Sequence, residues 1–174
     1  VAWRKIADVD DGVTSFDLAG STMFLLTHKG ASRYKVTTID LSNAGQTAQS
    51  ARVIVPPSDV VVQQIAVAGD GLYVRGILGG LANLRKLSLG ANGATGTAAG
   101  VKLPFAGTMQ EFGTDPRVAG AAIGLVAWTH SLLVYALGAN GTLTDTGIVK
   151  PSSIDTSAYT STEVQSKSSD GTMV

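Results

Sequence analysis

Residues 20–41, GSTMFLLTHKGASRYKVTTIDL, combine two strand-forming stretches with a short glycine-containing connection. Residues 24–27 are apolar except for the final threonine, which is typical of a buried strand. Residues 33–41 alternate apolar and polar side chains, as a strand with one buried face does. Because the polar connection at 29–32 is short, we expect the two stretches to form a β-hairpin.

Two later segments repeat this pattern. Residues 69–89, GDGLYVRGILGGLANLRKLSL, offer the same turn, strand, connection and strand, and residues 120–137, GAAIGLVAWTHSLLVYAL, offer a shorter version. The last residues of the three hairpins, Leu41, Leu89 and Leu137, are spaced by 48 positions. A period of this size, with several short strands in each repeat, is typical of the blades of a β-propeller.

Further strands are expected around the hairpins. We predict them at residues 3–8, 13–18, 52–55, 60–68, 101–103, 108–112, 142–149 and 163–168. The segment GANGATGTAAG at 90–100 has no bulky side chain, and we predict a flexible loop there. No stretch keeps the apolar spacing of a helix behind a capped start, which indicates an all-β chain.

These strands predict a partial β-propeller with about three four-stranded antiparallel blades. The first blade is expected at residues 1–41, the second at 50–89, and the third, with an exit strand, at 101–149. Residues 150–174 are rich in serine and threonine and lack the period, so we expect them to lead out of the propeller.

Composition excludes several classes of partner. The chain has 174 residues with 13 Lys or Arg and 13 Asp or Glu, so no basic surface favours a nucleic-acid partner. No apolar run is long enough to predict a membrane span, and the first residues do not have the pattern of a signal peptide. The absence of cysteine removes disulfides and thiol chemistry, and is compatible with both the cytoplasm and the periplasm.

The sequence offers no catalytic constellation, and we expect no catalytic, cofactor-binding or metal-binding residue in it. Ser32 lacks the second glycine that a nucleophile elbow requires. His28 and His130 each follow a threonine at the expected end of a third strand, which favours structural or loop roles over proton transfer. No pair of histidines or carboxylates has the spacing of a metal site.

Three glycine-containing patterns resemble known sites only in part. Residues 8–12, DVDDG, begin like a calcium loop, but Ala19 stands where that loop needs a bidentate carboxylate, so a β-turn is favoured. Residues 69–71, GDG, lack the third glycine and the helix of a dinucleotide motif, and a hairpin turn is favoured. Residues 140–142, NGT, have the glycosylation pattern, but the same residues form a tight turn.

Aromatic residues offer one further alternative. A ligand-stacking face is conceivable, but core or blade-to-blade packing is favoured by their strand positions. The residues concerned are Trp3, Tyr34, Tyr73, Trp128 and Tyr135.

Residues 3–41 look like a blade from the N-terminal β-propeller of the prolyl oligopeptidases. In that family a threonine ends the third strand of a blade and an Arg-Tyr-Lys-like segment opens the fourth. The corresponding residues here are Thr27 and RYK at 33–35, followed by IDL at 39–41.

The resemblance extends over most of the chain. Residues 52–57 are similar to the family's valine-rich strand that ends in proline, and AWT at 127–129 is similar to its aromatic residue followed by threonine. Residues 154–174, with SDGT at 169–172, resemble the crossover from the propeller into the hydrolase domain.

This resemblance implies both a fold and a role. Members of the family have a seven-bladed propeller that caps an α/β-hydrolase domain with a Ser-His-Asp triad, and they cleave short peptides after proline. The chain resembles the last three blades and the first hydrolase residues, so no catalytic residue can be carried over. The implied role is the non-catalytic, substrate-gating portion of a serine endopeptidase, with a peptide substrate, the hydrolase domain and the remaining blades as partners.

Stacked blades would place Phe24, Tyr73 and Val126 in equivalent strands. Three blades alone would leave two apolar faces open, so we expect self-association, and a head-to-tail pair could close a six-bladed ring. The alternative is a free-standing propeller that binds a protein or carbohydrate partner. An enzyme with its active site in the propeller channel would need a carboxylate cluster, which the sequence does not offer.

Overall fold

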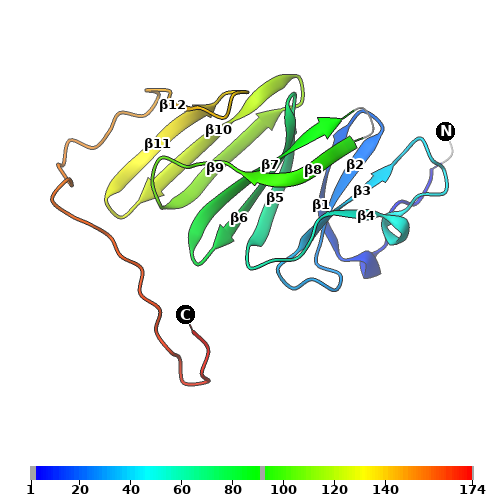
Figure 1. Cartoon of the computed structure of the whole chain (residues 1–174), viewed down its shortest axis with the longest axis horizontal. Coiled ribbons are helices and arrows are strands. Elements are labelled where there is room, and N and C mark those ends of the chain that lie inside the picture. Colours follow the sequence, from blue (N-terminus) through cyan, green and yellow to red (C-terminus); the bar gives the residue numbers. More distant parts are fainter. Residues whose placement is uncertain (1–2, 91–92, 174) are drawn as a thin grey trace.

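The chain forms three four-stranded antiparallel sheets that stand side by side (Figure 1). The structure, a computed structural model, describes residues 3–90 and 93–173. We name the sheets blade 1 to blade 3 along the chain. Within each blade the strands pair in sequence order, so the first strand lies at one edge and the fourth at the other. The expected all-β, partial β-propeller fold is confirmed.

The blades use short strands joined mostly by tight turns. Blade 1 contains β1 (Val13–Ala19), β2 (Thr22–Thr27), β3 (Lys35–Asp40) and β4 (Arg52–Val55). Blade 2 contains β5 (Val61–Ala68), β6 (Gly71–Leu78), β7 (Leu81–Gly90) and β8 (Gly93–Gly100). Blade 3 contains β9 (Thr108–Asp115), β10 (Val118–Ala127), β11 (His130–Leu137) and β12 (Leu143–Asp145). Two 3₁₀ helices, η1 (Val9–Asp11) and η2 (Ala48–Ser50), accompany blade 1.

The repeat is confirmed, because Phe24, Tyr73 and Val126 lie in β2, β6 and β10, the second strands of the three blades. Its phase differs from the prediction. Leu41, Leu89 and Leu137 lie at the ends of the third strands rather than the fourth.

The blade boundaries shift for the same reason. Residues 3–8 form no strand, and the fourth strand of blade 1 is β4, which pairs with β3. Blade 1 therefore spans 13–55 rather than 1–41. The other two blades span 61–100 and 108–145, in place of 50–89 and 101–149.

The glycine- and alanine-rich segment forms β8 rather than the predicted flexible loop, although residues 91–92 lie outside the described residues. β8 pairs with β7 over a register that includes Lys86↔Ala99 and Arg85↔Gly100. An outermost strand needs a partner on one edge only, so backbone hydrogen bonds hold it without bulky side chains. Residues 101–103, predicted as a strand, form a connection instead.

Two hydrophobic cores hold the blades together, and blade 2 contributes to both. The core between blades 1 and 2 contains Phe24, Leu26, Val36, Val55, Val62, Ile65, Val67, Leu72, Val74 and Leu87. The core between blades 2 and 3 contains Ala68, Tyr73, Leu84, Met109, Ile123, Leu125 and Leu137. Both cores follow from the alternation along each strand, which sends successive side chains to opposite faces of a blade.

The first strands of the blades, β1, β5 and β9, lie next to one another and are joined through Val67. The Val67 N–H donates to the Asp17 carboxylate of blade 1 at 2.7 Å. The Thr114 hydroxyl of blade 3 donates to the Val67 carbonyl, also at 2.7 Å. Because β5 is an edge strand, its outward backbone groups need such partners, and neighbouring blades supply them.

The chain after β12 leaves the blades as an extended segment (Figure 1). Thr146 still bonds to Val134 of β11. Farther along the segment, the Thr156 hydroxyl donates to the Thr129 carbonyl at 2.7 Å, and the Ser152 N–H donates to the Ser131 hydroxyl at 3.1 Å. The strand predicted at 163–168 does not form, although Lys167 makes an isolated bridge with Met173. Over the described ranges, no helix is long and apolar enough to cross a membrane.

Candidate functional site

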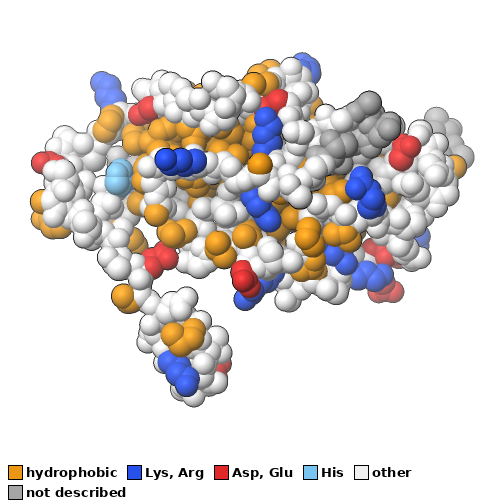
Figure 2. Space-filling model, viewed as in Figure 1, with side chains coloured by type: hydrophobic (Ala, Val, Ile, Leu, Met, Phe, Trp, Pro, Cys, Tyr) orange, Lys and Arg blue, Asp and Glu red, His pale blue; other side chains and the backbone are white. Residues whose placement is uncertain are grey.

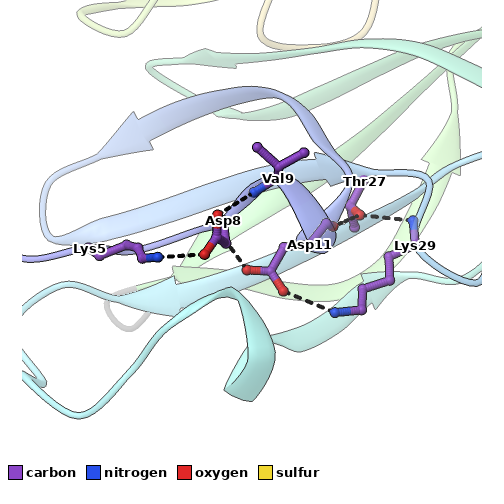
Figure 3. A network of polar contacts seen from close by, with 6 residues as sticks. All are labelled: Lys5, Asp8, Val9, Asp11, Thr27 and Lys29. Carbon is purple, nitrogen blue, oxygen red and sulfur yellow. Dashed lines mark hydrogen bonds and ion pairs between the residues drawn. The ribbon is translucent and has the colours of Figure 1, made fainter.

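The acidic segment at residues 8–12 forms η1 and its caps rather than a calcium loop. Asp8 is the N-cap residue, and its carboxylate accepts the Val9 N–H at 2.8 Å. The Asp11 carboxylate accepts the Asp8 N–H at 2.9 Å and the Lys29 ammonium at 3.1 Å (Figure 3). These contacts, the Asp8 N–H first, lower the pKa of Asp11. Its oxygens therefore already have partners.

A hydroxyl ties this turn to the second strand of blade 1. The Thr27 hydroxyl donates to the Asp11 carbonyl at 2.7 Å and accepts the Lys29 N–H at 3.0 Å (Figure 3). Asp11 and Thr27 are buried, with relative exposures of 5% each. The threonine that the family resemblance singled out therefore has a structural role at the end of β2.

The two histidines are separate and contact aromatic rings. His28 follows β2 and meets Tyr34 edge to face, with ring centroids 5.8 Å apart. His130 opens β11 and stacks on Phe105, with centroids 4.3 Å apart and an interplanar angle of 13°. Both follow the second strand of their blade rather than the third. Within the described part of the chain, no three histidine or acidic side chains could hold a metal ion.

The turn at residues 69–71 is a hairpin turn, and its aspartate joins blade 2 to blade 3. The Asp70 carboxylate accepts the Tyr73 hydroxyl at 3.1 Å and the Gly120 N–H of β10 at 2.9 Å, and it pairs with the Lys86 ammonium. Burial alone would raise the pKa of Asp70. The hydrogen bonds from Lys86, Gly120 and Tyr73 together outweigh burial and lower it. This is a seam between blades, with all four groups satisfied.

Tyr73 lies at the centre of that seam and is fully buried. Its ring meets Phe112 of β9 with centroids 6.4 Å apart, and the Lys86 ammonium lies 5.6 Å from the ring centroid. Burial, and secondarily the Asp70 charge, raises the pKa of Tyr73 well above its usual value. The phenol donates its hydrogen to the Asp70 carboxylate.

The five aromatic residues do not form a common face. Tyr34 packs against the core between blades 1 and 2, and Tyr73 and Tyr135 belong to the core between blades 2 and 3. Core packing is confirmed for these three. It is wrong for Trp3 and Trp128, which are 98% and 97% exposed.

The Asn-Gly-Thr motif forms the predicted turn. The Asn140 carboxamide oxygen accepts the Thr142 N–H at 3.0 Å, and Gly141 has a φ of 80°. Asn140 is exposed.

A cavity of about 620 Å³ lies between blades 2 and 3, at the end of the blades that carries the β6–β7 and β10–β11 turns. Its walls come from the β6–β7 turn at Gly80 and Leu81, the start of β9, the end of β10 with Trp128, and residues 161–163. The volume lies in the range of small-molecule sites. The sequence did not predict this cavity, because it brings together segments more than 80 positions apart in the chain.

Ser32 and the cavity between blades 2 and 3 differ in their surroundings. Ser32 is exposed, in the turn before β3. The cavity between blades 2 and 3 contains one carboxylate, Glu163, and one large aromatic ring, Trp128, on otherwise small and apolar walls. Such a site could hold a ligand, whereas the Asp70 seam serves packing.

Solved structures of several peptidases contain a part with a similar fold. A prolyl endopeptidase structure is 19% identical, with a TM-score of 0.75 over 91% of this chain and 23% of that chain. Prolyl oligopeptidase B from Galerina marginata is 20% identical, with a TM-score of 0.74 over 99% and 24%. Oligopeptidase B from Leishmania major is 17% identical, with a TM-score of 0.72 over 91% and 24%. The chain thus spans about a quarter of the length of these proteins.

Sequence comparison gives the family. A search of curated proteins finds no match. The model of the prolyl oligopeptidase N-terminal β-propeller domain matches residues 2–125, well over half of the chain. This match, on a chain built of stacked four-stranded blades, shows that it belongs to the family of prolyl oligopeptidase N-terminal β-propeller domains.

Proposed function

We propose that this chain is the substrate-gating, non-catalytic portion of a prolyl oligopeptidase-like serine endopeptidase that cleaves short peptides after proline. The family membership carries this proposal. The blade arrangement supports it, because β1, β5 and β9 side by side form one stretch of an inner propeller wall. A wall of this kind restricts what reaches an enclosed active site and shields the chemistry from water.

The solved relatives support a role that involves peptides and a second domain. Prolyl oligopeptidase B from Galerina marginata has been solved with 25-residue and 35-residue substrates bound. In a pair of prolyl endopeptidases, inter-domain dynamics have a role in catalysis and specificity. By analogy, residues 150–173 would connect the blades to a hydrolase domain, and further blades would complete the ring.

The outer faces of blades 1 and 3 are suited to contact with further blades. Ile123 and Leu125 point toward blade 2, so the residues between them face away from it: Ala122 is exposed, and Gly124 is covered by the Glu111 side chain. Blade 1 instead exposes Phe16, at 59%.

Without further blades, a second copy of the chain would be the partner for these faces. The large side chains Phe16 and Leu18 of one copy would pack on the small residues of the other copy's blade 3, such as Ala122. Lys35 on the first face and Glu111 on the second carry opposite charges.

The test compares the hydrolase domain with and without this chain. If the coding sequence extends past Val174, the added part should contain a Gly-x-Ser-x-Gly motif, which this chain lacks. The hydrolase domain alone should cleave proline-containing peptides of any length, and joining it to the propeller should remove activity toward long and folded substrates. The chain by itself should not cleave a proline-containing chromogenic peptide. Turnover by the chain that a serine-directed inhibitor abolishes would contradict the proposal.

A further inference from the structure

The cavity between blades 2 and 3 presents an unusual pair of groups. The Trp128 indole is 97% exposed and stacks on no other aromatic ring among the described residues. Glu163, which lines the same cavity, makes no hydrogen bond or ion pair with any other described residue. An indole offers a large apolar face together with one N–H donor, so a partner that covers Trp128 would gain contact area.

Glu163 is exposed, and its carboxylate lies near the β6–β7 turn. Gly80 in this turn has a φ of 87°, and a Cβ built on it would lie 3.4 Å from the Glu163 carboxylate oxygen. A Cβ at position 80 would thus be in ordinary van der Waals contact with the carboxylate, which shows that Glu163 lies over the turn. Thr156 holds the segment that carries Glu163 against blade 3 through the Thr129 carbonyl.

The remaining walls are apolar or small. Leu81, Ala106, Val126 and Ala127 line the cavity, together with hydroxyl groups and no cationic side chain. A positive charge is therefore the complement that the cavity itself does not supply. The face of an indole and a carboxylate both attract ammonium and guanidinium groups.

We propose that this cavity binds a peptide segment that inserts a positively charged group, attached to an apolar stem, between the Trp128 indole and the Glu163 carboxylate. The charged group is either a Lys or Arg side chain or a free α-amine, since all of these provide the same cationic donor. The aliphatic stem packs on Leu81 and Val126. The inference goes beyond the proposed gating role and does not depend on it, because it concerns only residues of this chain.

The experiment uses the whole 174-residue chain carrying Trp3→Phe, so that Trp128 is the sole tryptophan and its fluorescence reports the site. Affinities are measured by calorimetry. The first probe is acetyl-Ala-Leu-Lys-Ala-amide, its control is the same peptide with norleucine in place of lysine, and the third is Leu-Ala-Ala-amide with a free amine. We expect the lysine peptide to bind about tenfold more tightly than the norleucine peptide and to change the Trp128 emission. The free-amine peptide distinguishes an α-amine site from a side-chain site.

Variants locate the interaction. Glu163→Gln and Trp128→Ala should each weaken binding of the cationic probe about fivefold to tenfold, and Glu111→Gln, on the outer face of blade 3, should leave it unchanged. Thr156→Val should also weaken binding by releasing the segment that carries Glu163, and Thr156→Ser should restore it. Equal affinity for the lysine and norleucine peptides, no binding of any probe at millimolar concentration, or an unaltered affinity in Glu163→Gln would each overturn the proposal.

Discussion

Asp70 joins three strands of two blades, since its carboxylate meets the Tyr73 hydroxyl, the Lys86 ammonium and the Gly120 N–H of the next blade. Its side chain is only 14% exposed. A carboxylate in this setting is worth more than a surface charge, because its removal leaves several buried donors without an acceptor. The seam between blades 2 and 3 should therefore be sensitive to this one group.

Replacing Asp70 by alanine should lower the free energy of unfolding by about 2 kcal/mol at pH 7, measured by urea denaturation. The pKa of Asp70 is lowered in the folded state, so its stabilising contribution is present above the unfolded value near 3.8. It is lost as the pH falls through the lower, folded value. The difference between the wild-type chain and Asp70→Ala should thus shrink below about pH 4. Asp59→Ala, at an exposed ion pair with Arg33, is the control, and it should cost little. A difference that stays constant down to pH 2 would contradict this account.

Arg85 differs from Asp70, because part of its buried guanidinium group lacks hydrogen-bond partners. Its Nε and Nη2 atoms are buried and have no partner among the described residues, and burial lowers its pKa. Replacing Arg85 by methionine should therefore leave stability unchanged or raise it by about 1 kcal/mol, seen as a higher midpoint of thermal unfolding. Arg52→Met, at an exposed position on the outermost strand of blade 1, serves as the control for a loss of charge alone. A clear loss of stability in Arg85→Met would show that the guanidinium has a partner.

The candidate site shows where inference from sequence ends. Patterns of adjacent residues predicted the turns at 69–71 and 140–142, because turn conformation depends on local backbone preferences. They did not predict that Trp128 and Glu163 line one cavity, since only tertiary packing brings these segments together. For the same reason, the exposure of Trp128 contradicted the expectation of core packing.

At the scale of strands, the period was predictable and its phase was not. The 48-residue spacing marks equivalent points in the repeat, and Phe24, Tyr73 and Val126 do occupy equivalent strands. The spacing alone does not say which strand begins a repeat. Blade 1 takes its fourth strand from residues 52–55 after a connection that contains η2. β8 escaped prediction because its composition is that of a linker, while its hydrogen bonds to β7 make it a strand.

β10 also contains a backbone position that accepts only glycine. Gly120 has a φ of 93°, and a Cβ there would lie 1.8 Å from the Leu137 carbonyl oxygen of β11. Gly120→Ala should therefore destabilise the chain by about 3 kcal/mol or more, measured by urea denaturation. Gly113→Ala in the neighbouring strand β9 meets nothing within 4 Å and should change stability by no more than about 0.5 kcal/mol. Similar losses in the two variants would mean that strand propensity, rather than the clash, sets the cost.

At the scale of the whole molecule, the outer faces of blades 1 and 3 govern the state of the isolated chain. Figure 2 shows further hydrophobic side chains grouped on the face of the blades that it presents. If the outer faces meet between copies, sedimentation velocity should show a dimer at micromolar concentrations, and Phe16→Lys should weaken it about tenfold or more. Val118→Lys, at an equally exposed position in the β9–β10 hairpin, should have no such effect. A chain that stays monomeric at several hundred micromolar would contradict pairing through the outer faces.

The central place of blade 2, whose strands contribute to both cores, has a consequence for cooperativity. In stacked repeats, stability is approximately the sum of each unit's own stability and of its interfaces with its neighbours. Blade 2 contributes to both interfaces. Blade 1 can therefore unfold while blades 2 and 3 stay packed, and blade 3 can unfold while blades 1 and 2 stay packed. Unfolding of blade 2 removes both interfaces at once. Protection against amide exchange should accordingly be graded, greatest in β5 to β7 and least at the two flanks, and the molecule would behave as a short chain of coupled units.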